Sequence, residues 1–131
     1  MTDKDDKQNY RLGKAGLSFF SSLMHSWSVS EEDQAIILGL SKEELSQLKN
    51  HLTDGNFSEF SSDLLLRLGL MVGISRNLNT LYPTERHASC LKAENARFGG
   101  VSLLDKLLTG KLDEMREVKT YLDSCCGSHF L

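Results

Sequence analysis

Residues 95–110 read Asn-Ala-Arg-Phe-Gly-Gly-Val-Ser-Leu-Leu-Asp-Lys-Leu-Leu-Thr-Gly and combine a glycine turn with a short leucine-rich helix. Ser102 is placed to cap the start of this helix, and Asp105 follows three residues later in the spacing of a capping box. Gly110 stands where a left-handed residue is needed to end it. One helical face carries the four leucines, Leu103, Leu104, Leu107 and Leu108. A helix this short with such an apolar face must dock onto a larger structure.

A longer apolar helix is predicted upstream of this stretch. Ser61 or Ser62 begins it, and Pro83 ends it. Its first half is apolar nearly all round, which predicts burial between partners. Gly69 and Gly73 lie four residues apart, and each costs up to about 1 kcal/mol relative to alanine in a helix interior. We therefore expect another helix to approach this face closely, either within the chain or across a homodimer.

The N-terminal half also has helical periodicity. Residues 14–25 carry apolar side chains at helical spacing, and Trp27 is expected to anchor them in the core rather than to form an exposed stacking surface. Ser30 and Ser41 are candidate N-caps for two short helices on either side of Gly39. Two short helices around a glycine-containing turn are typical of a helix-turn-helix.

These patterns predict an all-α fold: a compact bundle of about six to seven short helices with a helix-turn-helix-like part and one long central helix. Two further helices are expected over residues 84–92 and 112–124. We divide the chain into a flexible N-terminal arm (residues 1–13), a helix-turn-helix-like region (14–60) and a C-terminal domain (61–131). The arm is either a disordered tail or a DNA-contacting segment.

Composition limits the class of protein. The 131 residues are 40% hydrophobic and 25% charged, which suits a packed core, and the net charge of −3 offers no general attraction to nucleic acid. Three cysteines, an odd number, argue against a disulfide framework. The most apolar run, residues 64–74, is too short to span a membrane, and residues 1–10 lack the apolar core of a signal peptide. We therefore expect a cytoplasmic protein without membrane contact.

No arrangement typical of catalysis or metal binding is evident. His87 lies three residues before Cys90, and the Cys125-Cys126 pair precedes His129. A zinc site needs about four well-placed ligands, and adjacent cysteines chelate poorly as a pair. No phosphate-binding loop or nucleophile–base set is present. We expect no enzymatic activity, no metal and no cofactor.

The stretch quoted above resembles the C-terminal domain of the Xre/MbcA/ParS family of antitoxins. The shared pattern is an Asn, a Phe followed by paired glycines, and a Ser-capped, leucine-rich helix that ends in Gly. It extends upstream over residues 63–83, which end in Leu-Tyr-Pro, and downstream over residues 112–123. The resemblance covers roughly residues 61–124, and more weakly 17–55. Family members often carry a Trp where this chain has Cys90, so the local packing is expected to differ.

The resemblance implies the antitoxin of a type II toxin–antitoxin system, with residues 61–131 as the toxin-binding domain. The implied partner is a RES-domain toxin that consumes NAD, whose active site the antitoxin blocks sterically within a homodimer or a larger hetero-oligomer. We expect the contact surface to comprise Arg97, Phe98, Gly99, Gly100, Lys106, His129, Phe130 and Leu131. Phe98 is either an apolar anchor for the toxin or a residue packed under the last helix. Arg97 is either a contact or a solvated loop charge.

An alternative function is DNA-binding transcriptional regulation through the helix-turn-helix at residues 30–52. Family members often also repress their own operon, so operator DNA is a second candidate partner. The candidate contacts are Lys42, Gln47, Lys49 and Asn50. However, residues 26–60 carry two lysines against seven acidic residues, a net charge of −5, which opposes contact with phosphates. A helical dimerisation module without a toxin partner is a third alternative.

Overall fold

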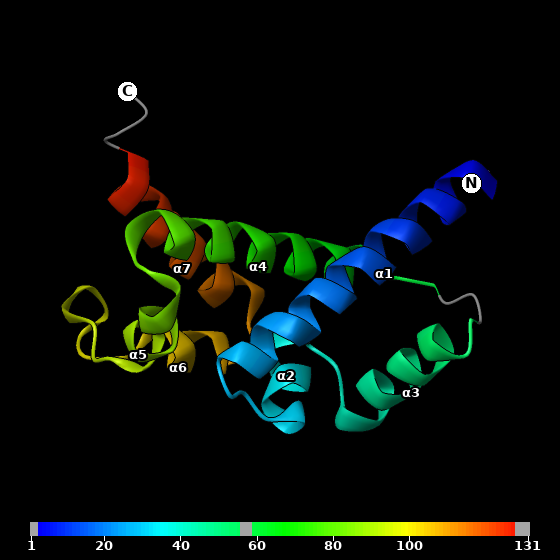
Figure 1. Cartoon of the computed structure of the whole chain (residues 1–131), viewed down its shortest axis with the longest axis horizontal. Coiled ribbons are helices and arrows are strands. Elements are labelled where there is room, and N and C mark those ends of the chain that lie inside the picture. The colour runs from blue at the N-terminus through cyan, green and yellow to red at the C-terminus, as the bar shows by residue number, and fades with distance from the viewer. Residues whose placement is uncertain (1–2, 56–58, 128–131) are drawn as a thin grey trace.

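The computed structural model describes residues 3–55 and 59–127, with side chains from residue 7 onward. This part of the chain contains seven α-helices and no strands, which confirms the predicted all-α bundle (Figure 1). The helices are α1 (Asp3–Ser26), α2 (Glu31–Leu38), α3 (Lys42–Thr53), α4 (Ser62–Leu81), α5 (His87–Lys92), α6 (Leu103–Leu107) and α7 (Leu112–Gly127). Single 3-10 turns precede α5 and α6, at Thr84–Arg86 and Ala96–Phe98.

The long central helix, α4, packs against both α1 and α7. Its inward stripe follows helical spacing and is buried: Leu64, Leu68, Met71, Ile74 and Leu78. Within the single chain this helix is not buried all round: Leu66 is 39% exposed and Gly69 is also exposed, so the predicted burial of its first half between partners stays a prediction. The helix therefore has one apolar face in the core and another at the surface.

The two glycines of α4 have different surroundings. A Cβ at Gly69 would have nothing within 4 Å, and one at Gly73 would meet only the flexible end of a lysine side chain from α7. The close approach is on α1: a Cβ at Gly16 would lie 3.3 Å from Leu68 of α4, and one at Gly13 would lie 2.3 Å from an aromatic ring. Contact of α1 with Leu68 of α4 thus depends on Gly16, and its contact with Phe60, which lies just before α4, depends on Gly13.

The segment predicted to be a flexible arm is helical from Asp3 and continuous with the rest of α1. The inward stripe of α1 continues through Gly13 to Tyr10, whose ring lies 6.4 Å from that of Phe60. Trp27, just after α1, is 2% exposed, which confirms its predicted core position. The hydrophobic core includes residues from α1 and α2 as well as α4 and α7, so regions 14–60 and 61–131 share one core.

The caps predicted for α2 and α3 are present. Ser30 Oγ accepts a hydrogen bond from the Asp33 amide at 3.2 Å, and Ser41 and Glu44 form a reciprocal capping box. Gly39 ends α2 with a left-handed φ of 70°. Leu45 is the buried residue of α3, and this helix stands away from the α4–α7 pair in Figure 1.

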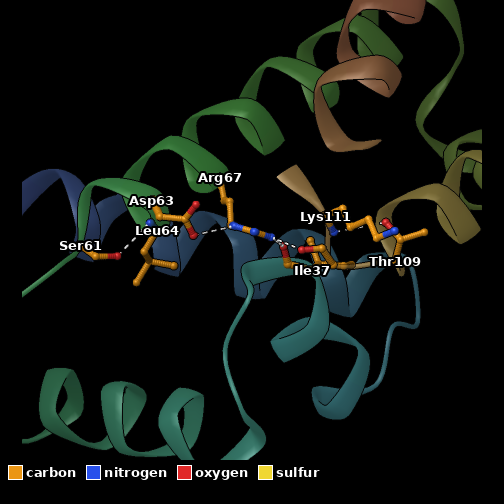
Figure 2. Close-up of polar contacts among 8 residues, drawn as sticks. Ile37, Ser61, Asp63, Leu64, Arg67, Thr109 and Lys111 are labelled. Carbon is orange, nitrogen blue, oxygen red and sulfur yellow. Dashed lines mark hydrogen bonds and ion pairs between the residues drawn. The ribbon is translucent and has the colours of Figure 1, made fainter. Parts of the chain in front are cut away.

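A buried arginine joins three distant segments, and nothing in the sequence pattern indicated it. The Arg67 side chain lies on α4, where its Nε binds Asp63 at 2.8 Å. Its Nη1 donates to the carbonyl oxygens of Ile37, at 3.1 Å, and Gly110, at 2.8 Å (Figure 2). These bonds satisfy carbonyls at the end of α2 and in the turn before α7, and so fix α6 and α7 relative to α2.

None of the helices in the described part of the chain combines the length and the apolarity that a bilayer-spanning helix requires.

Candidate functional site

The glycine turn between α5 and α6 has the local geometry that its sequence predicts. The Asn95 side chain accepts a hydrogen bond from the Arg97 amide at 2.9 Å. Gly99 and Gly100 then adopt positive φ values of 65° and 94°. A Cβ at either glycine would have nothing within 4 Å, so both are required for the backbone angles rather than for close approach.

The cap of α6 is also as predicted. Ser102 Oγ accepts a hydrogen bond from the Asp105 amide at 3.0 Å. After α6, Gly110 has a φ of 72°, and a Cβ at this position would lie 3.0 Å from the carbonyl oxygen of Ile36. The turn and the short helix are therefore held at both ends.

Phe98 packs against the last helix while remaining half-buried. Its ring meets that of Tyr121 on α7 edge to face, with the ring centres 5.5 Å apart and the planes at 68°. Lys106 Nζ lies 4.3 Å from the centre of the same ring, within the range of a cation–π interaction. Much of the Phe98 ring therefore packs under α7, which was one of the two predicted alternatives, and part of the ring stays accessible.

Lys106 does not lie on the exposed surface where the sequence analysis placed it. The residue is 9% exposed, and its ammonium pairs with Glu114, at 2.6 Å, and with Glu117 on α7. Hydrogen bonds to Glu114 and Glu117 raise the pKa of Lys106 and outweigh the opposing effect of burial. Lys106 therefore joins α6 to α7, and its ammonium also contacts the Phe98 ring.

A surface hollow of ≈ 430 Å³ lies beside Phe98. We call it the aromatic–arginine hollow; its lining consists of Arg97, Phe98, Arg116, Glu117, Thr120, Tyr121 and Ser124. Arg97 and Arg116 are exposed, and neither guanidinium has a hydrogen bond or ion pair with the residues described by the structure. The hollow thus combines two aromatic rings with two guanidiniums that make no direct ion pair to the described residues.

Sequence reasoning missed Arg116 and Tyr121 as site residues. The buried stripe of α7 consists of Met115, Val118, Leu122 and Cys126. Residues at helical spacing beside that stripe face away from the core, and this spacing is the signal that would have pointed to them. Which loop they face depends on packing between α6 and α7, which the sequence pattern does not give.

The four candidate DNA contacts do not form one surface. Lys42, Gln47 and Asn50 are exposed, whereas Lys49 is half-buried and binds Gln34 Oε1 at 3.3 Å. Its ammonium also lies 3.8 Å from a carboxylate oxygen of Glu31 on α2. Gln47 faces a hollow beside the start of α4, and Lys49 faces another beside α1. The two side chains therefore lie on different sides of α3.

The remaining candidate positions add no assembled site. Cys90 and Cys125 are half-buried free thiols, and burial raises the pKa of the buried thiol of Cys126. Within residues 3–55 and 59–127, no three His, Cys, Asp or Glu side chains are grouped as a metal site would require. The predicted tail contacts, His129, Phe130 and Leu131, lie outside the described residues.

Comparison with known proteins adds no relative: no family model matches the chain, and no curated protein matches it.

Proposed function

We propose that this chain is the antitoxin of a type II toxin–antitoxin system and sterically blocks a RES-domain, NAD-consuming toxin. The observation that carries the proposal is the aromatic–arginine hollow, where Arg97 and Arg116 are exposed beside the half-buried ring of Phe98 and make no ion pair to the described residues. Exposed aromatic and arginine side chains are the usual energetic centres of protein interfaces. The resemblance of residues 61–124 to the antitoxin family points to the same segment.

The proposed mechanism is exclusion of substrate without chemistry by this chain. The turn at Gly99 and Gly100 is held by the Asn95 and Ser102 hydrogen bonds, and α6 is joined to α7 by Lys106. A surface fixed in advance loses little conformational entropy when it binds, so more of the contact energy becomes affinity. Occupation of the NAD-binding cleft by this surface would exclude the nucleotide. Assembly as a homodimer within the complex belongs to the same proposal.

Co-expression with the neighbouring toxin gene tests this function. We expect the toxin alone to arrest growth and deplete NAD, and the wild-type chain to restore both. An Arg97→Glu, Phe98→Ala double variant should restore neither, because it loses the central contacts, whereas Arg76→Glu on α4 should behave as wild type. Growth arrest that persists with the folded wild-type chain would contradict neutralisation.

Operator binding through α2 and α3 is a weaker second proposal. The two capped helices and the exposed Lys42, Gln47 and Asn50 favour it, but Lys49 is already paired with acidic and amide groups. A gel shift with the DNA upstream of the gene, at low and at high salt, tests it. Absence of a salt-sensitive shift, even with toxin present, would eliminate DNA binding.

A further inference from the structure

The aromatic–arginine hollow has a local charge opposite to that of the whole chain. Its charged lining residues are Arg97, Arg116 and Glu117. The carboxylate of Glu117 is paired with Lys106, whose ammonium also binds Glu114. Lys106 can neutralise only one of these two carboxylates, so Arg97, Arg116 and Lys106 together with Glu114 and Glu117 leave a local charge of +1 on a protein whose net charge is −3. Such a site attracts carboxylate or phosphate groups.

The floor of the hollow is formed largely by aromatic rings. The rings of Phe98 and Tyr121 contact each other edge to face. The Lys106 ammonium nitrogen lies 4.3 Å from the centre of the Phe98 ring. The volume, ≈ 430 Å³, falls within the range of about 300–1,000 Å³ that is typical of sites for small ligands. The hollow is therefore of the size to receive a side chain and its immediate neighbours. Thr120 and Ser124 supply hydroxyl groups at its edge.

We propose that this hollow receives a protruding loop of a protein partner that carries carboxylates on both sides of an aromatic or large aliphatic side chain. This inference rests on the proposed function and specifies the chemistry of the toxin surface that the antitoxin contacts. The apolar side chain would pack on Phe98 and Tyr121, and the carboxylates would bind the forks of Arg97 and Arg116.

The inference also places the hollow relative to the toxin's nucleotide site. A cleft that binds the diphosphate of NAD must itself present positive charge or amide donors to the phosphates. Arg97 and Arg116 would be repelled from cationic side chains there, because like charges at close range are unfavourable. The hollow therefore contacts an acidic rim of the cleft rather than the phosphate subsite.

A peptide titration tests the chemistry without requiring the toxin. Isotope-labelled full-length chain is titrated with three capped peptides, Gly-Asp-Trp-Glu-Gly, Gly-Lys-Trp-Lys-Gly and Gly-Asp-Ala-Glu-Gly, while backbone amide shifts are followed by NMR. The acidic tryptophan peptide should shift the amides of Arg97, Phe98, Thr120, Tyr121 and Ser124. Its affinity should fall several-fold when salt is raised from about 0.05 M to about 0.5 M, because the charged contacts are screened.

Arginine variants complete the test. Arg97→Glu with Arg116→Glu should abolish the shifts, whereas Arg76→Glu, an exposed arginine on α4, should retain them. The proposal is overturned if the acidic tryptophan peptide shifts no residue of the hollow, if the lysine or alanine peptide binds equally well, or if the double variant binds like wild type. If the acidic tryptophan peptide does not bind but the chain neutralises the toxin, only this inference is removed. If the peptide binds but the chain does not neutralise the toxin, the antitoxin function is removed and the chemistry of the hollow stands.

Discussion

Arg67 is the residue that connects the two halves of the chain. It is 7% exposed, and it donates to carbonyl oxygens that lie 30 and 43 residues away in the sequence. Replacing it with methionine keeps much of the volume and leaves the carbonyls of Ile37 and Gly110 without their donor. We expect Arg67→Met to lower the free energy of unfolding by about 2–4 kcal/mol, measured by urea denaturation.

Arg76→Met on the same helix is the control and should change stability by less than about 0.5 kcal/mol, because Arg76 is exposed. An Arg67→Met variant as stable as this control would show that the buried guanidinium does not hold α2, α4 and the turn before α7 together.

Two glycines should respond to alanine in opposite directions. Gly110 has a φ of 72° and would bring a Cβ to 3.0 Å from a backbone oxygen, so Gly110→Ala should destabilise the fold by more than about 1 kcal/mol. Gly69 is in a helix interior with nothing within 4 Å, so Gly69→Ala should stabilise it by about 0.5–1 kcal/mol. Thermal and urea denaturation of both variants provides the measurement. If the two substitutions shift the midpoints in the same direction, this explanation is refuted.

The capping residues were predicted correctly because their partners are close in the chain. Ser30, Ser41 and Ser102 each cap an amide three residues later, so their pattern is visible without the fold. Arg67 could not be found in this way, because a single arginine on an apolar helix has no local signal for its distant carbonyl partners.

At the scale of elements, α6 and α7 are joined through Lys106. Glu114 and Glu117 raise the pKa of Lys106, so the folded state favours the charged form. The resulting stabilisation is complete below the unfolded lysine pKa of about 10.4 and is lost as pH rises through the higher folded value. We expect Lys106→Met to cost about 1–2 kcal/mol near neutral pH, because two carboxylates then lose their cation.

Denaturation of both proteins from neutral to strongly alkaline pH provides the measurement. The difference between wild type and Lys106→Met should narrow at the alkaline end, whereas Lys92→Met, at an exposed lysine of α5, should show no such change. A difference that stayed constant with pH would mean that packing against Phe98, rather than the ion pairs, accounts for the effect.

The position of a helix was predictable where a single apolar stripe and its capping residues marked it. The serine caps and Pro83 marked α4, and its observed bounds agree closely with that prediction. The start of α1 was not predictable, because its first turns are polar and carry no apolar stripe. The contact that α1 makes near this end, between Tyr10 and Phe60, joins residues far apart in the sequence. The glycines of α4 suggested close helix approach, but a sequence does not show which face of a two-sided apolar helix lies inward.

At the scale of the whole molecule, the candidate site combines a predicted loop with an unpredicted helix face. Arg97 and Phe98 were predicted through the family resemblance, and both line the hollow. Arg116 and Tyr121 join them because α7 packs beside α6, a tertiary contact that spacing alone does not specify. Lys106 was expected in the same contact surface through the resemblance, and its two glutamate partners account for its burial.

The central claim is that this chain inhibits a partner by binding over the partner's active-site cleft and excluding its substrate. Titration of the purified product of the neighbouring gene, the proposed toxin, with the purified chain while NAD consumption is recorded tests it most directly. We predict that NAD consumption falls to zero at a fixed molar ratio, and that Arg97→Glu with Phe98→Ala fails to inhibit while remaining folded. Undiminished NAD consumption at saturating wild-type chain would contradict the claim, as would inhibition by the double variant equal to that of wild type.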